Sequence, residues 1–155
     1  MPDRILNRIK SVTRNDLYTW CDEYIRENKS DIINIVKERL THGESVTGSG
    51  AVGYYKQQWY SDFKRSLNPL ADGNVDLFRY GNLFKGLDII QFGNGYKILS
   101  TDEKYEKLGK KYGFEEFGIT KHQHEELTKE LILHCYDKII KKMLYFSLNF
   151  DVQNR

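Results

Sequence analysis

Two stretches of the chain repeat their apolar residues with the period of an α-helix. The first covers residues 16–40, and its stripe comprises Leu17, Trp20, Cys21, Tyr24, Ile32, Val36 and Leu40. A polar run, Glu27–Asp31, interrupts this stripe, so Ser30 is expected to cap a second helix. The other stretch follows Thr120, and its stripe comprises Leu127, Leu131, Cys135, Ile139, Met143 and Phe146. Thr120 with Gln123 three residues later has the pattern of a capping box, which predicts the start of a long helix.

The middle of the chain contains a hairpin pattern. Residues Leu87–Phe92 and Tyr96–Leu99 are strand-like, and Gly93-Asn94-Gly95 joins them with the chemistry of a tight turn. A capped helix over residues 103–111 is predicted after the hairpin, with Gly113 at its end. Aromatic residues spaced by four predict a further helix over 54–67, which must end before Pro69.

These elements predict an α+β fold that is predominantly helical. A small antiparallel β-sheet, the hairpin near 87–99, is expected to pack against the long helices. We expect a single domain over residues 1–155. The Gly- and Ser-rich stretch at about 41–53 is expected to be a flexible loop, and the C-terminal tail from Asn149 is expected to fray.

Composition favours a soluble protein that contacts other molecules. The chain has 155 residues and 14% aromatic residues, with 11 tyrosines, and tyrosine is enriched at interfaces. Its formal charge of +2 is low for a dedicated nucleic-acid binder. No apolar run approaches the roughly 20 residues of a membrane span, and the N-terminus is too polar for a signal peptide. Cys21 and Cys135 lie on apolar stripes, as reduced core cysteines do.

Several patterns resemble ligand or catalytic sites but lack the required context. Gly48–Gly53 reads GxGxxG, yet no strand precedes it and no GK[ST] follows, so a flexible loop is the favoured interpretation. His122 and His124 are two apart and face different sides of a helix, which does not suit a shared metal. Glu125 and Glu126 suit the positive end of the helix dipole.

Catalytic groups are equally hard to find in the sequence. There is no nucleophile motif, and the adjacent acids Glu115 and Glu116 are expected on a solvated surface. No catalytic residue, cofactor site or metal site is therefore predicted. Carboxylates brought together by folding are the one route to a hydrolase that the sequence leaves open.

The aromatic and basic segment Tyr54–Arg65 has two interpretations. Aromatic side chains flanked by lysine and arginine can stack the bases of single-stranded nucleic acid. The favoured interpretation is a half-buried helix whose aromatics serve core and subunit packing, because the near-neutral charge of the chain steers nucleic acid weakly.

Two segments resemble a known family. Asp76–Gly86, DLFRYGNLFKG, resembles the L-x-x-T-G-x-L-x-x-S turn of tailed-bacteriophage neck and tail-completion proteins, in which the turn leads into a strand. The run 111–120, KYGFEEFGIT, is similar to a YG-x-x-I-F-G-L-T segment of small phage virion proteins. The likeness covers roughly residues 54–144. Tyr80 stands where the family has Thr, and Lys85-Gly86 replaces its Ser region.

The resemblance implies a structural virion protein, a ring-forming subunit of the neck or head–tail connector that joins portal to tail. It implies no enzymatic activity and no cofactor. Expected partners are further copies of the chain in a cyclic oligomer and other neck, portal or tail proteins, with no membrane. Direct contact with DNA is left open but is not favoured. The expected location is the virion, assembled in the cytoplasm of the host bacterium. A small nucleic-acid-binding protein that uses residues 54–65 is the alternative. The interface candidates are Tyr54, Tyr55, Trp59, Tyr60, Tyr80, Phe84, Tyr112 and Phe117.

Overall fold

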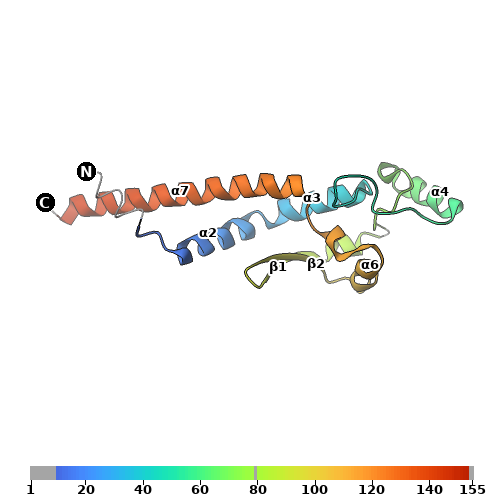
Figure 1. Cartoon of the computed structure of the whole chain (residues 1–155), viewed down its shortest axis with the longest axis horizontal. Coiled ribbons are helices and arrows are strands. Elements are labelled where there is room, and N and C mark those ends of the chain that lie inside the picture. The colour runs from blue at the N-terminus through green and yellow to red at the C-terminus, as the bar shows by residue number, and fades with distance from the viewer. Residues whose placement is uncertain (1–9, 79, 154–155) are drawn as a thin grey trace. The chain divides into compact units, whose positions relative to one another are not determined.

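A computed structural model describes residues 10–78 and 80–153, with side chains as far as Leu144. Its elements in chain order are α2 (Arg14–Glu27), α3 (Lys29–Thr41), α4 (Gln58–Leu67), η1 (Pro69–Ala71), α5 (Asn82–Lys85), β1 (Leu87–Phe92), β2 (Gly95–Ser100), α6 (Tyr105–Tyr112), η2 (Phe114–Phe117) and α7 (Lys121–Gln153) (Figure 1). The predicted fold class is confirmed, because helices dominate and the single described sheet is a two-stranded antiparallel hairpin.

Contacts divide the chain into two compact units, where a single domain was expected. Unit 1 comprises residues 1–28 and 125–155, and unit 2 comprises residues 29–124. The expected frayed tail is helical as far as Gln153, and residues 154–155 lie outside the described part of the chain.

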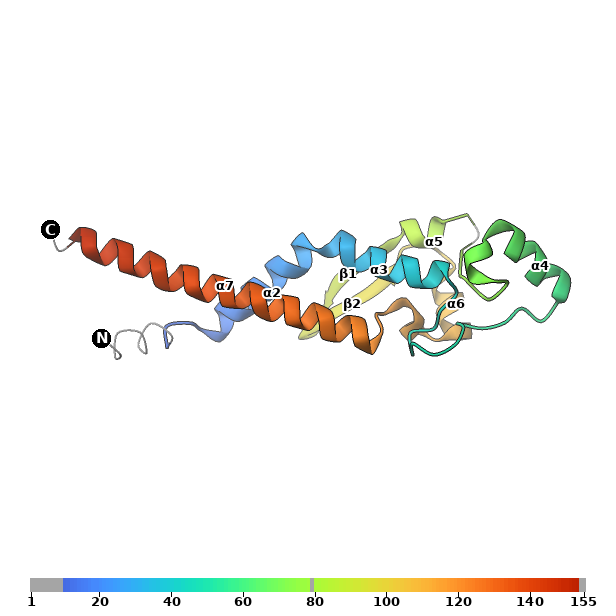
Figure 2. The same cartoon turned by 90° about the horizontal axis from the view of Figure 1, so that it is seen from above.

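Unit 1 is built from α2 and the greater part of α7, which run side by side (Figure 2). Their polar contacts are the Asp16–Lys142 ion pair at 2.8 Å, the Glu23–Lys138 ion pair at 2.6 Å, and a 2.7 Å hydrogen bond that the Tyr24 hydroxyl donates to Glu130. Residue numbers rise along α2 as they fall along α7 in these pairs, so the two helices are antiparallel. Apolar burial in α2 is provided by Trp20 and Tyr24.

The ends of the helices follow capping chemistry. Thr13 and Asp16 form a complete capping box at the start of α2. The break predicted within Glu27–Asp31 falls at Asn28, whose side-chain amide donates to the carbonyl of Tyr24 at 2.8 Å and closes α2. The predicted box at the start of α7 is confirmed, because Thr120 and Gln123 exchange side-chain to backbone hydrogen bonds of 2.8 and 3.2 Å.

Unit 2 packs the hairpin and the short helices around α3. The strands pair from Leu87 opposite Ser100 to Phe92 opposite Gly95, so the predicted hairpin is confirmed. Along β1 burial alternates at its start, where Leu87 and Ile89 enter the core. The other apolar side chains buried in this unit are Ile32, Ile33, Val36, Leu40, Ala71, Val75, Leu83, Phe84, Tyr105 and Phe117.

A buried ion pair holds the Gly- and Ser-rich loop that was expected to be flexible. Arg39 of α3 lies 3.3 Å from the carboxylate of Glu116, and both side chains are almost completely buried. The same carboxylate accepts hydrogen bonds from the Ser45 hydroxyl at 2.7 Å and from the backbone N–H of Val46 at 2.8 Å. Burial lowers the pKa of Arg39, and the attraction of Glu116 opposes this effect. The loop is thus fixed at its base, where Glu44 and Ala51 also form a β-bridge.

The two adjacent acids provide a matched test of this arrangement. Glu116 is 6% exposed, contrary to the solvated surface expected for both acids, whereas Glu115 is exposed. Glu116→Ala leaves the Arg39 guanidinium buried without its carboxylate and should lower the free energy of unfolding by about 3–5 kcal/mol. Glu115→Ala should change it by less than about 0.5 kcal/mol. Urea unfolding followed by circular dichroism measures both values, and equal losses would contradict the assignment.

Candidate functional site

The aromatic segment differs from the favoured prediction. Helix α4 begins at Gln58, and Tyr54 instead forms a β-bridge with Asn74. The favoured interpretation was that these aromatics serve core and subunit packing. Its core part is wrong for Trp59, which is 67% exposed, and its subunit part stays a prediction. The one residue of α4 that is buried is a lysine, Lys64. The helix therefore turns one of its charged residues inward and leaves the ring of Trp59 outside.

Burial of Lys64 is possible because Asp76 faces it. Its ammonium lies 2.8 Å from the Asp76 carboxylate, with exposures of 3% and 1% for the two side chains, and it also donates to the carbonyl of Phe78. The remaining acceptor capacity of Asp76 is used by the Asn68 amide at 2.9 Å and the backbone N–H of Phe78 at 3.1 Å. Asn68 also donates to the carbonyl of Thr41 at 2.7 Å. One carboxylate thus joins α4, the end of α3 and the turn that begins at Asp76.

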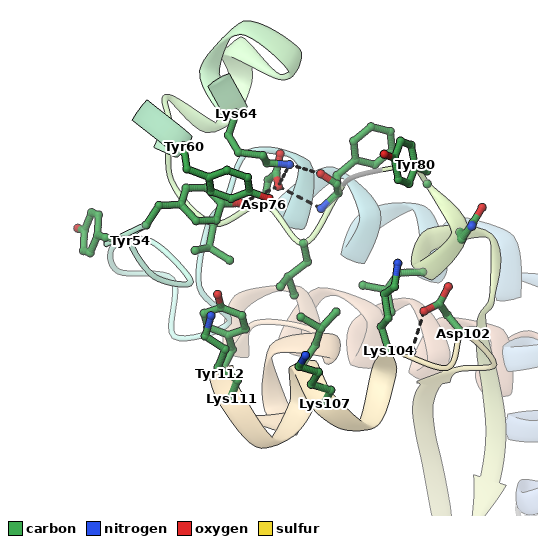
Figure 3. A pocket seen from close by; sticks show the side chains of 18 of the residues that line it. Tyr54, Tyr60, Lys64, Asp76, Tyr80, Asp102, Lys104, Lys107, Lys111 and Tyr112 are labelled. Atoms are coloured by element: carbon green, nitrogen blue, oxygen red, sulfur yellow. Dashed lines mark hydrogen bonds and ion pairs between the residues drawn. The ribbon is translucent and has the colours of Figure 1, made fainter. Parts of the chain in front are cut away.

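A cavity of about 680 Å³ opens beside this ion pair (Figure 3). Three stretches of unit 2 contribute to its lining: residues 54–57, 59, 60 and 64; residues 75–78 and 80–83; and residues 102, 104, 107, 108, 111 and 112. Tyr54 and Tyr60 border it on one side, and Lys104, Lys107 and Lys111 border it on the side of α6. Val75, Leu77, Leu83 and Leu108 add apolar surface. Aromatic rings, an apolar floor and a cationic rim therefore meet in one place.

The charge of the lining is strongly one-sided. It contains five lysines and two aspartates, whereas the whole chain has a net charge of only +2. Lys64 and Asp76 neutralise each other. The Asp102 carboxylate accepts a 2.8 Å hydrogen bond from the backbone N–H of Lys104. Within the described residues no carboxylate forms an ion pair with the remaining lysines of the lining, which are Lys56, Lys104, Lys107 and Lys111.

The rings in and around the cavity contact one another mainly edge to face. Tyr55 and Tyr60 have centroids 4.9 Å apart with planes at 88°, and Trp59 and Tyr60 have centroids 5.5 Å apart with planes at 75°. Burial and the nearby Asp76 carboxylate raise the pKa of the Tyr55 hydroxyl far above its ordinary value. Lys111 lies over the ring of Tyr112, with its ammonium 4.7 Å from the centroid.

The eight interface candidates separate into two groups. Six of them line the cavity, namely Tyr54, Tyr55, Trp59, Tyr60, Tyr80 and Tyr112. Phe84 and Phe117 are 7% and 0% exposed, so they offer no surface to another molecule. They pack in the core instead, Phe84 on Phe78 and Phe117 on Tyr105.

Sequence reasoning missed the basic side of this site. Lys104, Lys107 and Lys111 follow one another at spacings of three and four, so they share a face of α6 and its cap. That spacing was visible in the sequence. Its significance was not, because only the fold brings this face opposite residues 54–60.

The other patterns considered in the sequence acquire no site geometry. No strand of the described sheet precedes Gly48–Gly53. No group of three or more His, Cys, Asp or Glu residues within 10–78 and 80–153 is arranged to hold a metal ion. Cys21 and Cys135 are free thiols of unit 1, half-buried, and burial together with the neighbouring Cys21 thiol raises the pKa of Cys135. None of the described helices is both long and apolar enough to cross a membrane.

Comparison of the chain with models of protein families, with curated proteins and with solved structures found no match.

Removal of Asp76 should destabilise the protein strongly. Asp76→Ala leaves the Lys64 ammonium buried and unpaired, so the free energy of unfolding should fall by about 3–5 kcal/mol. The apolar double variant Lys64→Met with Asp76→Leu should recover part of this loss, because it buries no unpaired charge. As the control, Asp62→Ala removes an exposed partner of Arg65 and should cost no more than about 1 kcal/mol. A single Asp76→Ala variant as stable as the control would contradict this account. Denaturant unfolding supplies the measurement.

Tyr55 should contribute a pH dependence at high pH. Its hydroxyl pKa is raised in the folded state above the ordinary value of 10.0, so the folded protein retains a proton that the unfolded chain loses. This contribution to stability is complete below about pH 10 and is lost progressively as pH rises above that value. Stability should therefore fall less steeply above pH 10 in Tyr55→Phe than in the unmodified chain. Identical slopes in unfolding experiments from pH 9 to 11 would contradict the assigned shift.

Proposed function

We propose that the chain is a structural subunit of a virion that assembles with copies of itself into a ring at the neck of a tailed bacteriophage, between portal and tail. It acts there by binding its neighbours and catalyses no reaction. The observation that carries the assembly role is an exposed apolar face on α7.

One face of α7 is used within unit 1. Glu130, Lys138 and Lys142 contact α2, and His134 packs edge to face on Tyr24 with centroids 5.5 Å apart. The side chains Ile132, Leu133, Tyr136, Ile140 and Leu144 lie on the opposite side, with exposures of 61%, 68%, 62%, 36% and 57%. A contiguous apolar stripe that is exposed on the side of a helix facing away from its partner is typical of a surface that another chain covers. We call these five residues the α7 stripe.

Unit 2 carries a different exposed apolar surface. Trp59, Phe63, Leu67 and Leu70 are 67%, 47%, 53% and 59% exposed, and the first three recur every fourth residue along α4. We call these four residues the α4 stripe. A ring requires two unlike surfaces on each subunit, because head-to-tail contacts join one patch to another. The α7 and α4 stripes satisfy this requirement, and patches of this kind are uncommon on proteins that work alone.

The resemblance supplies the virion assignment. Its turn begins at Asp76, the carboxylate that anchors this region, and Gly81 adopts a left-handed conformation with φ of 75° before α5. The chain then enters β1 at Leu87, and a turn that leads into a strand is also the family pattern. Arg79 of this motif lies outside the described residues.

Charged residues in the α7 stripe should abolish self-assembly. In Ile132→Lys with Tyr136→Lys, two side chains that would each contribute roughly 1.5–3 kcal/mol on burial are lost, so association should weaken at least tenfold. Glu103→Lys, an exposed position of unit 2 outside both stripes, is the control and should assemble normally. Light scattering after size exclusion, alone and with the portal protein of the same phage, gives the mass. Circular dichroism establishes that each variant is folded.

Imaging of the particle tests the location. Mass spectrometry should detect the chain in purified particles, and cryo-electron microscopy should place a ring of copies between portal and tail. A monomer both alone and with portal, or a particle that holds one isolated copy, would overturn the proposal.

A further inference from the structure

We propose that the cavity between residues 54–60, residues 75–78 and 80–83, and α6 binds single-stranded nucleic acid, with bases against its aromatic rings and phosphates along the lysines of α6 and its N-cap. This inference shares Trp59 with the α4 stripe, but its tests use the isolated chain and do not depend on ring formation. It develops the alternative that the sequence left open for residues 54–65, in which direct contact with nucleic acid was not the favoured interpretation.

Charge complementarity identifies the ligand as an anion. Four lysines of the lining form no ion pair within the described residues, while the chain as a whole is close to neutral. Lys104, Lys107 and Lys111 all have exposed side chains on the same side of α6. A low overall charge weakens long-range attraction but leaves a local cationic groove intact.

The aromatic rings identify the rest of the ligand. Trp59 and Tyr54, at 67% and 76% exposure, present large rings beside the cavity without contributing to the core. Edge-to-face contacts with Tyr60 hold Trp59 in place and leave ring surface for a flat partner. Every nucleobase has such a face, so stacking of this kind needs no particular sequence. An anion that also carries planar rings fits both halves of the site.

The spread of the lysines favours a strand over a free nucleotide. From Lys104 to Lys111 is seven residues, or about 10 Å along a helix. Cations spread over that length fit a row of phosphates, whereas a mononucleotide would leave most of them unused. The GxGxxG loop, which is the only pattern in the sequence typical of a phosphate cradle, does not line the cavity. A duplex hides its base faces within the stack, so the ligand is single-stranded.

Fluorescence anisotropy of a labelled twelve-nucleotide oligothymidylate, titrated with the full chain, tests the proposal. Binding should weaken steeply between about 50 and about 200 mM NaCl. The triple variant Lys104→Gln, Lys107→Gln, Lys111→Gln should bind at least tenfold more weakly. The slope of log Kobs against log salt should become shallower by about 2, at roughly 0.7 for each lost phosphate contact. The charge-matched control Lys110→Gln, Lys129→Gln, Lys141→Gln removes three lysines outside the lining and should bind within twofold of the unmodified chain.

Base stacking on the aromatic rings is tested by a second pair of variants, one inside the cavity lining and one outside it. Trp59→Ala should weaken binding by about 5- to 100-fold, the effect typical of losing one aromatic–base stack. Phe63→Ala removes another exposed ring of the α4 stripe that does not line the cavity, and it should bind within twofold of the unmodified chain. Because Trp59 and Trp20 are the two tryptophans of the chain, a Trp20→Phe background should show quenching of Trp59 emission as the oligonucleotide binds.

Three results would overturn the proposal. One is the absence of binding at about 50 mM NaCl. Another is equal loss of binding in the triple variant and its charge-matched control. The last is tighter binding of thymidine monophosphate, or of an acidic tyrosine-containing peptide, than of the oligonucleotide.

Discussion

The ion pair between Lys64 and Asp76 organises the part of the molecule that carries the candidate site. A lysine is seldom buried, and here the cost of removing its ammonium from water is offset by one carboxylate and one backbone carbonyl. Because Asp76 also binds Asn68 and the N–H of Phe78, the position of α4 is coupled to the course of the turn. The cavity exists in the space between these elements. Its shape therefore depends on a single buried charge pair.

A buried pair also explains why the rim can remain cationic. Five lysines in one cavity would repel one another if all were enclosed, but the one that is buried is neutralised by its partner. The remaining four keep their stems along the lining and their charges near solvent. The site thus separates a structural lysine from those available to a ligand.

Local patterns in the sequence predicted the parts of the fold that local chemistry determines. The hairpin at 87–100, the capping box at Thr120 and the break near Asn28 each depend on a few consecutive residues. The burial of Lys64 and Glu116 was not predictable in this way. Arg39 and Glu116 are 77 residues apart. The local sequence around each of them resembles that around a solvent-exposed charged residue. Charged residues enter a core only as pairs, and a pattern along one segment does not reveal the partner on another.

The same limit applies to the candidate site. The aromatic content of the sequence pointed to residues 54–60. Six of the eight side chains predicted to lie at an interface do line the cavity. Phe84 and Phe117 were selected by the same aromatic criterion, yet each is surrounded by its own unit. Aromatic type alone does not distinguish a ring that fills a core from one that faces a ligand. The three lysines of α6 were overlooked because each looks like an ordinary surface residue until the fold places it opposite Tyr54 and Tyr60.

The division of the chain has a consequence for its synthesis on the ribosome. Unit 1 is completed by α7, so Tyr24 cannot meet Glu130 until roughly a hundred further residues have been translated. Unit 2 is continuous in sequence and has all of its residues available earlier. Translation therefore produces α2 before unit 2, but it completes unit 2 before unit 1. Because domains generally fold as units, unit 2 can fold while α2 still lacks its partner. During that interval the apolar side of α2 lacks its partner helix, and synthesis of α7 supplies it.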